Sequence, residues 1–277
     1  MSYLTGFKSA PFELFTTTTA AGTVVNSDAS LATLVGSSWT TGDGRDFVLV
    51  QNAGTALAAG VVVQGPAAQA NAVGLSPATT GTTGYLASQG PIAAAIGGKV
   101  IQLATGATAV LANRFAGGYL NVVEGTGLGQ TLAISGNTAA STTSAFSVTL
   151  EDPFTTATST DSRYTLTINP YGSKNGTDFT TDGVIISPAT TLTGQVLGVS
   201  CYPIPATTAS VLSYGFIQTK GPVAVLAGST VALGLDVGVP TSSAGMIVTY
   251  AVATTTKVGT TLVASASSKY NLINVTL

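Results

Sequence analysis

Residues 115–152 read FAGGYLNVVEGTGLGQTLAISGNTAASTTSAFSVTLED, and the pattern of this stretch recurs along the whole chain. Tyr119, Asn121 and Val123 alternate with two apolar residues, which is the period of a β-strand. Three glycines within five positions, at 125, 127 and 129, then interrupt the extended chain and predict a tight hairpin turn. A second alternating run, 146–150, ends before Pro153, which cannot donate a ladder hydrogen bond.

Short alternating runs separated by Gly, Thr and Ser continue on both sides of this stretch, so we predict an all-β protein. Its domains are expected to be small β-barrels or β-sandwiches with an irregular N-terminal arm. The strands that we expect outside the opening stretch are 46–52, 60–64, 98–103, 164–169, 184–187, 195–201, 213–219, 222–226, 230–235, 246–251 and 272–277. Short helical turns are expected only at 29–34 and 93–96.

The expected domain organisation follows the changes in composition along the chain. Residues 1–40 are predicted to form an N-terminal arm, 41–103 the first part of a β domain, 104–172 an inserted β subdomain and 183–277 a C-terminal β-barrel. A polar linker, GSKNGTDFTTD, joins the last two. A strand–turn–strand pattern near residues 54–63 and 224–233 weakly suggests an internal duplication.

The arm contains apolar side chains that are unsuited to free solution. Phe7, Phe12, Leu14, Phe15 and Trp39 are therefore the predicted interface residues, packing on the arm's own domain or on a neighbouring subunit. Each buried Phe would contribute on the order of 2 kcal/mol. We expect the arm to make intermolecular contacts.

Charge is the most unusual property of the composition. Charged residues make up 7% of the 277 residues, against about 25% in typical soluble domains. Such a surface has little electrostatic protection against association, which favours a protein that spends its life covered by neighbours. The nine basic residues are scattered singly, so we expect no nucleic acid as direct ligand.

Few residues here are suited to chemistry. Without histidine, triads and the commonest metal sites are excluded, and no enzyme activity, catalytic residue or cofactor is expected. Asp43 with Asp46, and Asp178 with Asp182, are loop carboxylates that calcium can use, but turn-forming Asp residues are the preferred interpretation and no metal is expected. The single cysteine, Cys201, is interpreted as a small buried hydrophobe.

The sequence shows no pattern of a targeting signal or a membrane span. The N-terminus lacks an uninterrupted apolar segment behind basic residues, and Gly and Thr interrupt every apolar run short of the ~18 residues of a membrane helix. The sequence therefore predicts no secretory signal and no membrane partner.

Several motifs carry a family resemblance. They are ANRFAGGYL (112–120), EGTGLGQ (124–130), VTLEDP (148–153), NPY (169–171), YGFIQTKGPV (214–223), Val258-Gly259 and the run 268–277. Together they resemble a group of tailed-phage virion proteins found in marine and freshwater phages. The resemblance covers roughly residues 44–277, in the same order, and leaves the arm unmatched.

The resemblance implies a capsid decoration or cement protein, made in the host cytoplasm and located on the capsid surface of the virion. Its expected partners are the major capsid protein and further copies of itself, with a trimer favoured. The main alternative is a head-fibre, tail-fibre or adhesin module that binds a host receptor or glycan. The capsid shell itself would need a long helix, for which no periodicity is found, and a cell-surface layer protein would need a signal.

Overall fold

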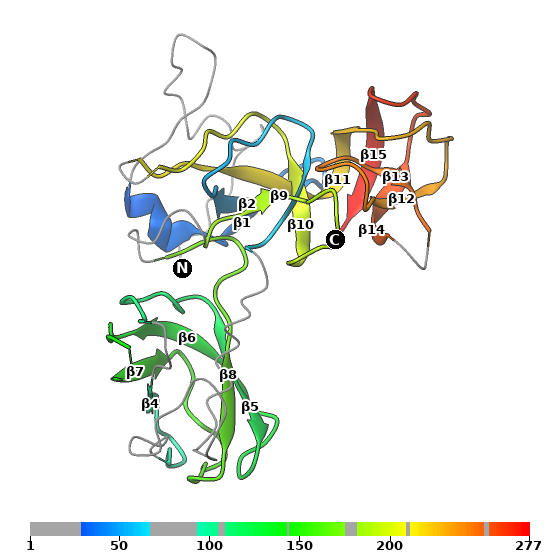
Figure 1. Ribbon diagram of the computed structural model, residues 1–277. Coiled ribbons are helices and arrows are strands. Elements are labelled where there is room, and N and C mark those ends of the chain that lie inside the picture. The colour runs from blue at the N-terminus through cyan, green and yellow to red at the C-terminus, as the bar shows by residue number, and fades with distance from the viewer. Residues whose placement is uncertain are drawn as a thin grey trace. The chain divides into compact units, whose positions relative to one another are not determined.

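A computed structural model of the chain describes residues 29–66, 93–104, 109–142, 144–174, 182–208, 211–251 and 255–277. It is all-β, as the sequence predicts: two antiparallel sheets, one of them curled into a half-barrel, with almost no helix (Figure 1). Two compact units divide the chain. Unit 1 comprises Met1–Ala68, Pro170–Gly172 and Phe179–Leu277, and unit 2 comprises Gln69–Asn169 and Ser173–Asp178.

Unit 1 contains the larger sheet, which begins after a short 3-10 helix, η2 (Ala29–Leu34). Its strands are β1 (Ser38–Thr40), β2 (Asp46–Gln51), β3 (Val62–Gln64), β9 (Ile185–Ile186), β10 (Val196–Ser200), β11 (Tyr214–Leu226), β12 (Asp236–Val239), β13 (Val248–Thr249), β14 (Thr256–Thr261) and β15 (Tyr270–Thr276). Their order is β13-β12-β14-β15-β11-β10-β3-β9, with β2 also pairing β11 and β1 pairing β2.

The long strand β11 organises this sheet. Its first part, Tyr214–Lys220, pairs with β2, and its second part, Lys220–Leu226, pairs with β15. We refer to the two parts as the first and second halves of β11. Figure 1 shows β15 running beside the second half.

The second half of β11 contributes to a core made almost entirely of β-branched side chains. The members of this valine core are Val62, Val196, Val199, Val223, Val225, Ala227, Val231, Val237, Val239, Ile247, Val258, Ile273 and Val275. β-Branched residues pack well on a pleated surface and have stiff side chains, which explains why the half-barrel is filled by small, shape-restricted groups.

The first half of β11 is buried on both faces. One face joins an aromatic core of Phe47, Tyr214 and Phe216 with Ala32, Val35, Leu49 and Leu212. The other face joins a cluster that contains Ile217, Ile204, Val48 and Val50. The packing at Gly215 is close: a Cβ there would lie 2.5 Å from Ile204 Cδ1 and 2.7 Å from its Cγ1, so a larger residue would force Ile204 to move.

Unit 2 is a five-stranded antiparallel sheet in the order β4-β7-β6-β5-β8. Its strands are β4 (Val100–Ala104), β5 (Tyr119–Glu124), β6 (Thr131–Asn137), β7 (Ala145–Leu150) and β8 (Arg163–Leu166). Alternate residues enter one core around Phe115, Phe146, Phe154 and Tyr164. The hairpin predicted at the three glycines is confirmed: it joins β5 to β6, and Gly125, Gly127 and Gly129 have φ of 79°, 83° and 91°.

The boundaries of the predicted domains can be compared with these units. Residues 29–40 pack with unit 1, where Trp39 of β1 contacts Phe216. The strand β4, grouped by sequence with the strands before it, pairs with β7 of unit 2. The strand expected at 230–235 is a loop with one bridge at Val231, and the helical turn expected at 93–96 is irregular chain that enters a turn at Ile96.

Candidate functional site

A corner in β11 lies where the strand changes partners, at Lys220 and Gly221. Gly221 has a φ of +91°, a backbone conformation that favours glycine. The pairing with β2 shifts register between Gln218 and Lys220, and Pro222 has no amide hydrogen to donate to a ladder. The ladder with β2 is therefore irregular here, although the pairing with β15 continues without a register shift from Lys220 to Leu226, and backbone groups left outside the ladder need other partners.

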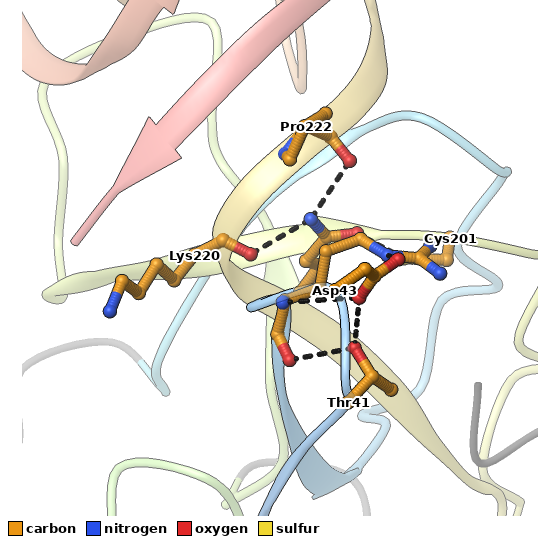
Figure 2. Close-up of polar contacts among 7 residues, drawn as sticks. Thr41, Asp43, Cys201, Lys220 and Pro222 are labelled. Carbon is orange, nitrogen blue, oxygen red and sulfur yellow. Dashed lines mark hydrogen bonds and ion pairs between the residues drawn. The ribbon is translucent and has the colours of Figure 1, made fainter. Parts of the chain in front are cut away.

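The buried Gln218 amide supplies such a partner, as Figure 2 shows. Its Nε2 donates to the carbonyl oxygens of Lys220 (2.9 Å) and Pro222 (3.0 Å), one on each side of Gly221. Its Oε1 lies 3.7 Å from the Cys201 sulfur, which is within reach of a weak thiol hydrogen bond. One side chain thus holds both carbonyls of the corner.

The turn between β1 and β2 covers the corner from outside. Arg45 Nε donates to Asp43 Oδ2 at 2.7 Å, and the Thr41 hydroxyl lies within hydrogen-bonding distance of the other Asp43 oxygen and of the Arg45 carbonyl (Figure 2). The hydrogen bond from Thr41, with help from Arg45, lowers the pKa of Asp43 below its usual value. A Cβ on Gly221 would lie 2.8 Å from Arg45 Cγ, so the Arg45 stem packs directly on the corner.

Cys201 has the properties of a structural residue. Burial raises the pKa of its thiol to about 12, and the nearby positive charge of Arg45 lowers it only in part. Because the thiolate is the nucleophilic form, the thiol is protonated and unreactive at neutral pH. Cys201 is partly buried, and its packing against the valine core and the aromatic core agrees with its interpretation as a small hydrophobe.

The carboxylates considered for calcium are placed differently by the structure. Asp43 is engaged by Thr41 and Arg45, Asp46 accepts a hydrogen bond from Thr40 at 2.6 Å, and Asp182 is buried. Asp178 lies outside the described residues. Within the described ranges no three acidic or cysteine side chains are grouped so that they could hold a metal ion. The same residues include no helix of the length and apolar character needed to cross a membrane.

Beyond the corner, part of the outward side of the half-barrel is apolar. We define the apolar outer face as Pro222, Ala224 and Leu226 of β11, Tyr270 and Leu272 of β15, and Leu262 just after β14. Tyr270 is 57% exposed, Leu262 41% and Leu272 39%. A solvated face of an antiparallel sheet is normally polar, so this face has the composition of a surface that is meant to be covered.

Register and hydrogen bonds show that these residues are neighbours. Ala224 is directly opposite Leu272, and Leu226 is opposite Tyr270. The Leu262 amide donates to the Leu272 carbonyl at 2.8 Å, which continues the row across a third strand. The Tyr270 ring lies over Gly60 and its hydroxyl donates to the Ala59 carbonyl at 3.1 Å, which fixes the orientation of the ring.

The interface residues predicted from sequence are only partly within the described chain. Trp39 is half-buried and its ring meets Phe216 edge-to-face with centroids 4.9 Å apart, so it belongs to the aromatic core of unit 1. Phe7, Phe12, Leu14 and Phe15 lie outside the described residues, and their role stays a prediction. The outer face was missed, although the sequence contains its signal: residues 270–275, YNLINV, have large apolar residues at both parities.

Unit 2 has a smaller outward group of a different kind. Tyr119 and Val123 of β5 are exposed, and Asn121 between them donates to the Thr165 hydroxyl at 3.4 Å. An ion pair between Arg163 and Glu124, 2.7 Å, lies at the end of the same strands. This surface is a single aromatic ring among polar groups.

Comparisons of the chain with protein-family models, with curated proteins and with solved structures gave no match.

Proposed function

We propose that this chain is a structural protein of a phage virion, a decoration or cement protein that stabilises the head by bridging major capsid subunits. The observation that carries the proposal is the apolar outer face on an all-β scaffold with very few charges. The sequence motifs that resemble tailed-phage virion proteins support the same class. In this proposal the protein acts as a homo-oligomer, with a trimer favoured, on the capsid surface.

The proposed mechanism is additive binding across subunit joints. A protein that binds only the assembled shell stabilises that shell by mass action, without any chemical step. Stable interfaces bury about 800 Å² on each partner, and their centres are depleted of charge. Apolar side chains and uncharged Thr and Asn, which dominate the described outward positions, are suited to this kind of contact.

The test compares heads with and without the protein. Heads that lack it should assemble and then open at a lower temperature, and adding the purified protein back should restore their resistance. Binding should change little between low and moderate salt, because few charges take part. If the deficient heads are equally robust, the decoration proposal is overturned.

A second candidate is a module that binds a host receptor or glycan. The exposed Tyr119 ring, with Asn121 and Thr165 beside it, is the observation that favours it, because sugar sites combine an aromatic platform with hydrogen-bonding groups. In this case Tyr119→Ala should reduce adsorption of particles to host cells and leave head stability unchanged. Unchanged adsorption by that variant would exclude this surface as the receptor site.

A further inference from the structure

The occupant of the apolar outer face can be inferred from the size of the face. The face extends over five residues of β11, three of β15 and Leu262 beyond β14, so it occupies at most about 14 by 17 Å, or roughly 240 Å² in plan. A stable dimer buries about 800 Å² on each partner, so two such faces packed together bury too little to hold two copies, whereas exchanged arms give each copy two contacts, one on its own face and one on its neighbour's. A single extended segment with a few large side chains matches this area.

The chain itself contains one segment of the right composition. Residues 1–28 include Phe7, Phe12, Leu14 and Phe15, with only Lys8, Glu13 and Asp28 charged. In an extended backbone Phe12 and Leu14 share one side and Glu13 lies on the other.

We propose that the apolar outer face of each copy is covered by residues 1–28 of a neighbouring copy, with Phe12 and Leu14 packed around Leu272. This rests on the proposed function, since an arm that returns to its own unit would link no subunits. Twenty-eight residues reach at most on the order of 95 Å when extended, which is enough to extend from one copy of the protein to a neighbouring copy. The face and the arm are thus two halves of one contact between copies.

Cross-linking of the purified full-length protein tests this contact. The variant Glu13→Cys/Asn274→Cys places one thiol beside Phe12 and one on the outward side of β15, two residues from Leu272, and leaves both apolar partners intact. A short bismaleimide should join different chains into dimers and larger species on a denaturing gel. The control Glu13→Cys/Thr165→Cys, with its second thiol on the outward side of β8 in unit 2, should give none.

Three results would overturn the inference. A cross-link within one chain would show that the arm covers its own face. A dimer from Asn274→Cys alone would show that two faces pack together, and no reaction beyond the control would show that the arm does not reach the face. Cys201 remains in all variants, so any cross-link through its thiol appears equally in the control.

A second measurement uses charge on the face. Leu272→Lys should lower the oligomer mass in sedimentation by at least the loss of one subunit and remove the cross-linked ladder, with the circular dichroism spectrum unchanged. Thr276→Lys, on the same side of the same strand but at its end, should leave the mass as it is. An unchanged oligomer in Leu272→Lys would overturn the proposal. Neither experiment involves heads. A negative result for the arm contact is therefore distinguishable from a negative result for binding to heads.

Discussion

The two halves of β11 differ in what covers them, although they are one strand. The first half, from Tyr214, is buried on both faces between an aromatic core and an aliphatic cluster. The second half has Val223 and Val225 in the valine core and Pro222 and Ala224 exposed on the other side. The comparison shows that a strand with apolar residues on both sides is not always packed on both faces. A second core forms only where another segment covers the second face.

The largest expected effect concerns the first half. Phe216→Ala removes a fully buried ring that contacts Trp39 and should lower the free energy of unfolding by about 3–5 kcal/mol. Val225→Ala in the second half removes a smaller side chain and should cost less. Urea denaturation followed by tryptophan fluorescence measures both, because Trp39 is the only tryptophan of the chain and lies in unit 1. Equal losses would contradict the greater contribution assigned to the doubly buried half.

The corner between the halves should depend on the Gln218 amide. Gln218→Met keeps the length of the side chain but leaves the carbonyls of Lys220 and Pro222 without their donor, at an expected cost of about 2–3 kcal/mol. Gln130→Met is the control, since that amide also bridges two carbonyls, of Gly127 and Thr156, and its Oε1 accepts from two backbone amides, all in a half-exposed position. Water can replace the Gln130 amide, so a similar loss in the control would argue against the role of burial at the corner.

A backbone substitution at the corner should have a somewhat smaller effect. Gly221→Ala combines a positive φ with a close contact to Arg45 and should cost about 1–3 kcal/mol. Gly234 also has a positive φ, +77°, but a Cβ there meets nothing within 4 Å. The excess loss of Gly221→Ala over Gly234→Ala, measured by thermal unfolding, gives the contribution of the packing of Arg45. No excess would mean that Arg45 moves aside freely.

In the second half one substitution should stabilise the protein. Asn271 is buried opposite Val225, and among the described residues neither its side-chain oxygen nor its nitrogen has a hydrogen-bond partner. Asn271→Leu removes the desolvation cost of the amide and should raise the free energy of unfolding by about 1–2 kcal/mol. A loss of stability instead would indicate that the amide binds a water molecule in the valine core, which a crystal structure of the protein would show.

The smallest effect concerns acid. The folded-state pKa of Asp43 is lowered, so its contribution to stability is fully present above its unfolded value of 3.8 and is lost as the pH falls through the folded pKa. Asp43→Asn should therefore be slightly less stable than the natural protein at pH 7 and equal to it at the lowest pH. Chemical denaturation at a series of pH values measures this difference. If the difference in free energy of unfolding between the two proteins does not change with pH, the charge of Asp43 is not its cause.

Much of the fold could be predicted from local pattern alone. The alternation in residues 146–150 and the three glycines at 125–129 correctly predicted strand and hairpin, because both signals depend only on neighbouring residues. The break expected between 219 and 222 was wrong, since β11 runs through it. Gly221 and Pro222 are held in the strand by the Gln218 side chain and by pairing with β15. The alternation of apolar and polar residues reveals neither contact.

Other features depend on tertiary context in the same way. The strand β14, TKVGTT, was not predicted because its composition resembles a loop, and its partners β12 and β15 lie elsewhere in the chain. The outer face was not predicted because an apolar residue in a strand is normally assigned to the core. Only the structure of the sheet tells which of its two sides is covered. The arm residues Phe7, Phe12, Leu14 and Phe15 stay predictions that the cross-linking experiment can decide.

The pairing of β11 with β15 also determines when unit 1 can be completed during synthesis. Residues 270–276 provide Ile273 and Val275 to the valine core and pair with seven residues of β11. The half-barrel therefore cannot close until these late residues have left the ribosome. All five strands of unit 2 lie between Val100 and Leu166, so that unit can fold while unit 1 still waits for its last strand. The nascent chain would then expose the inner side of the second half of β11 while about fifty further residues, from Leu226 to Thr276, are translated, and a chaperone that binds extended apolar segments would find its target there.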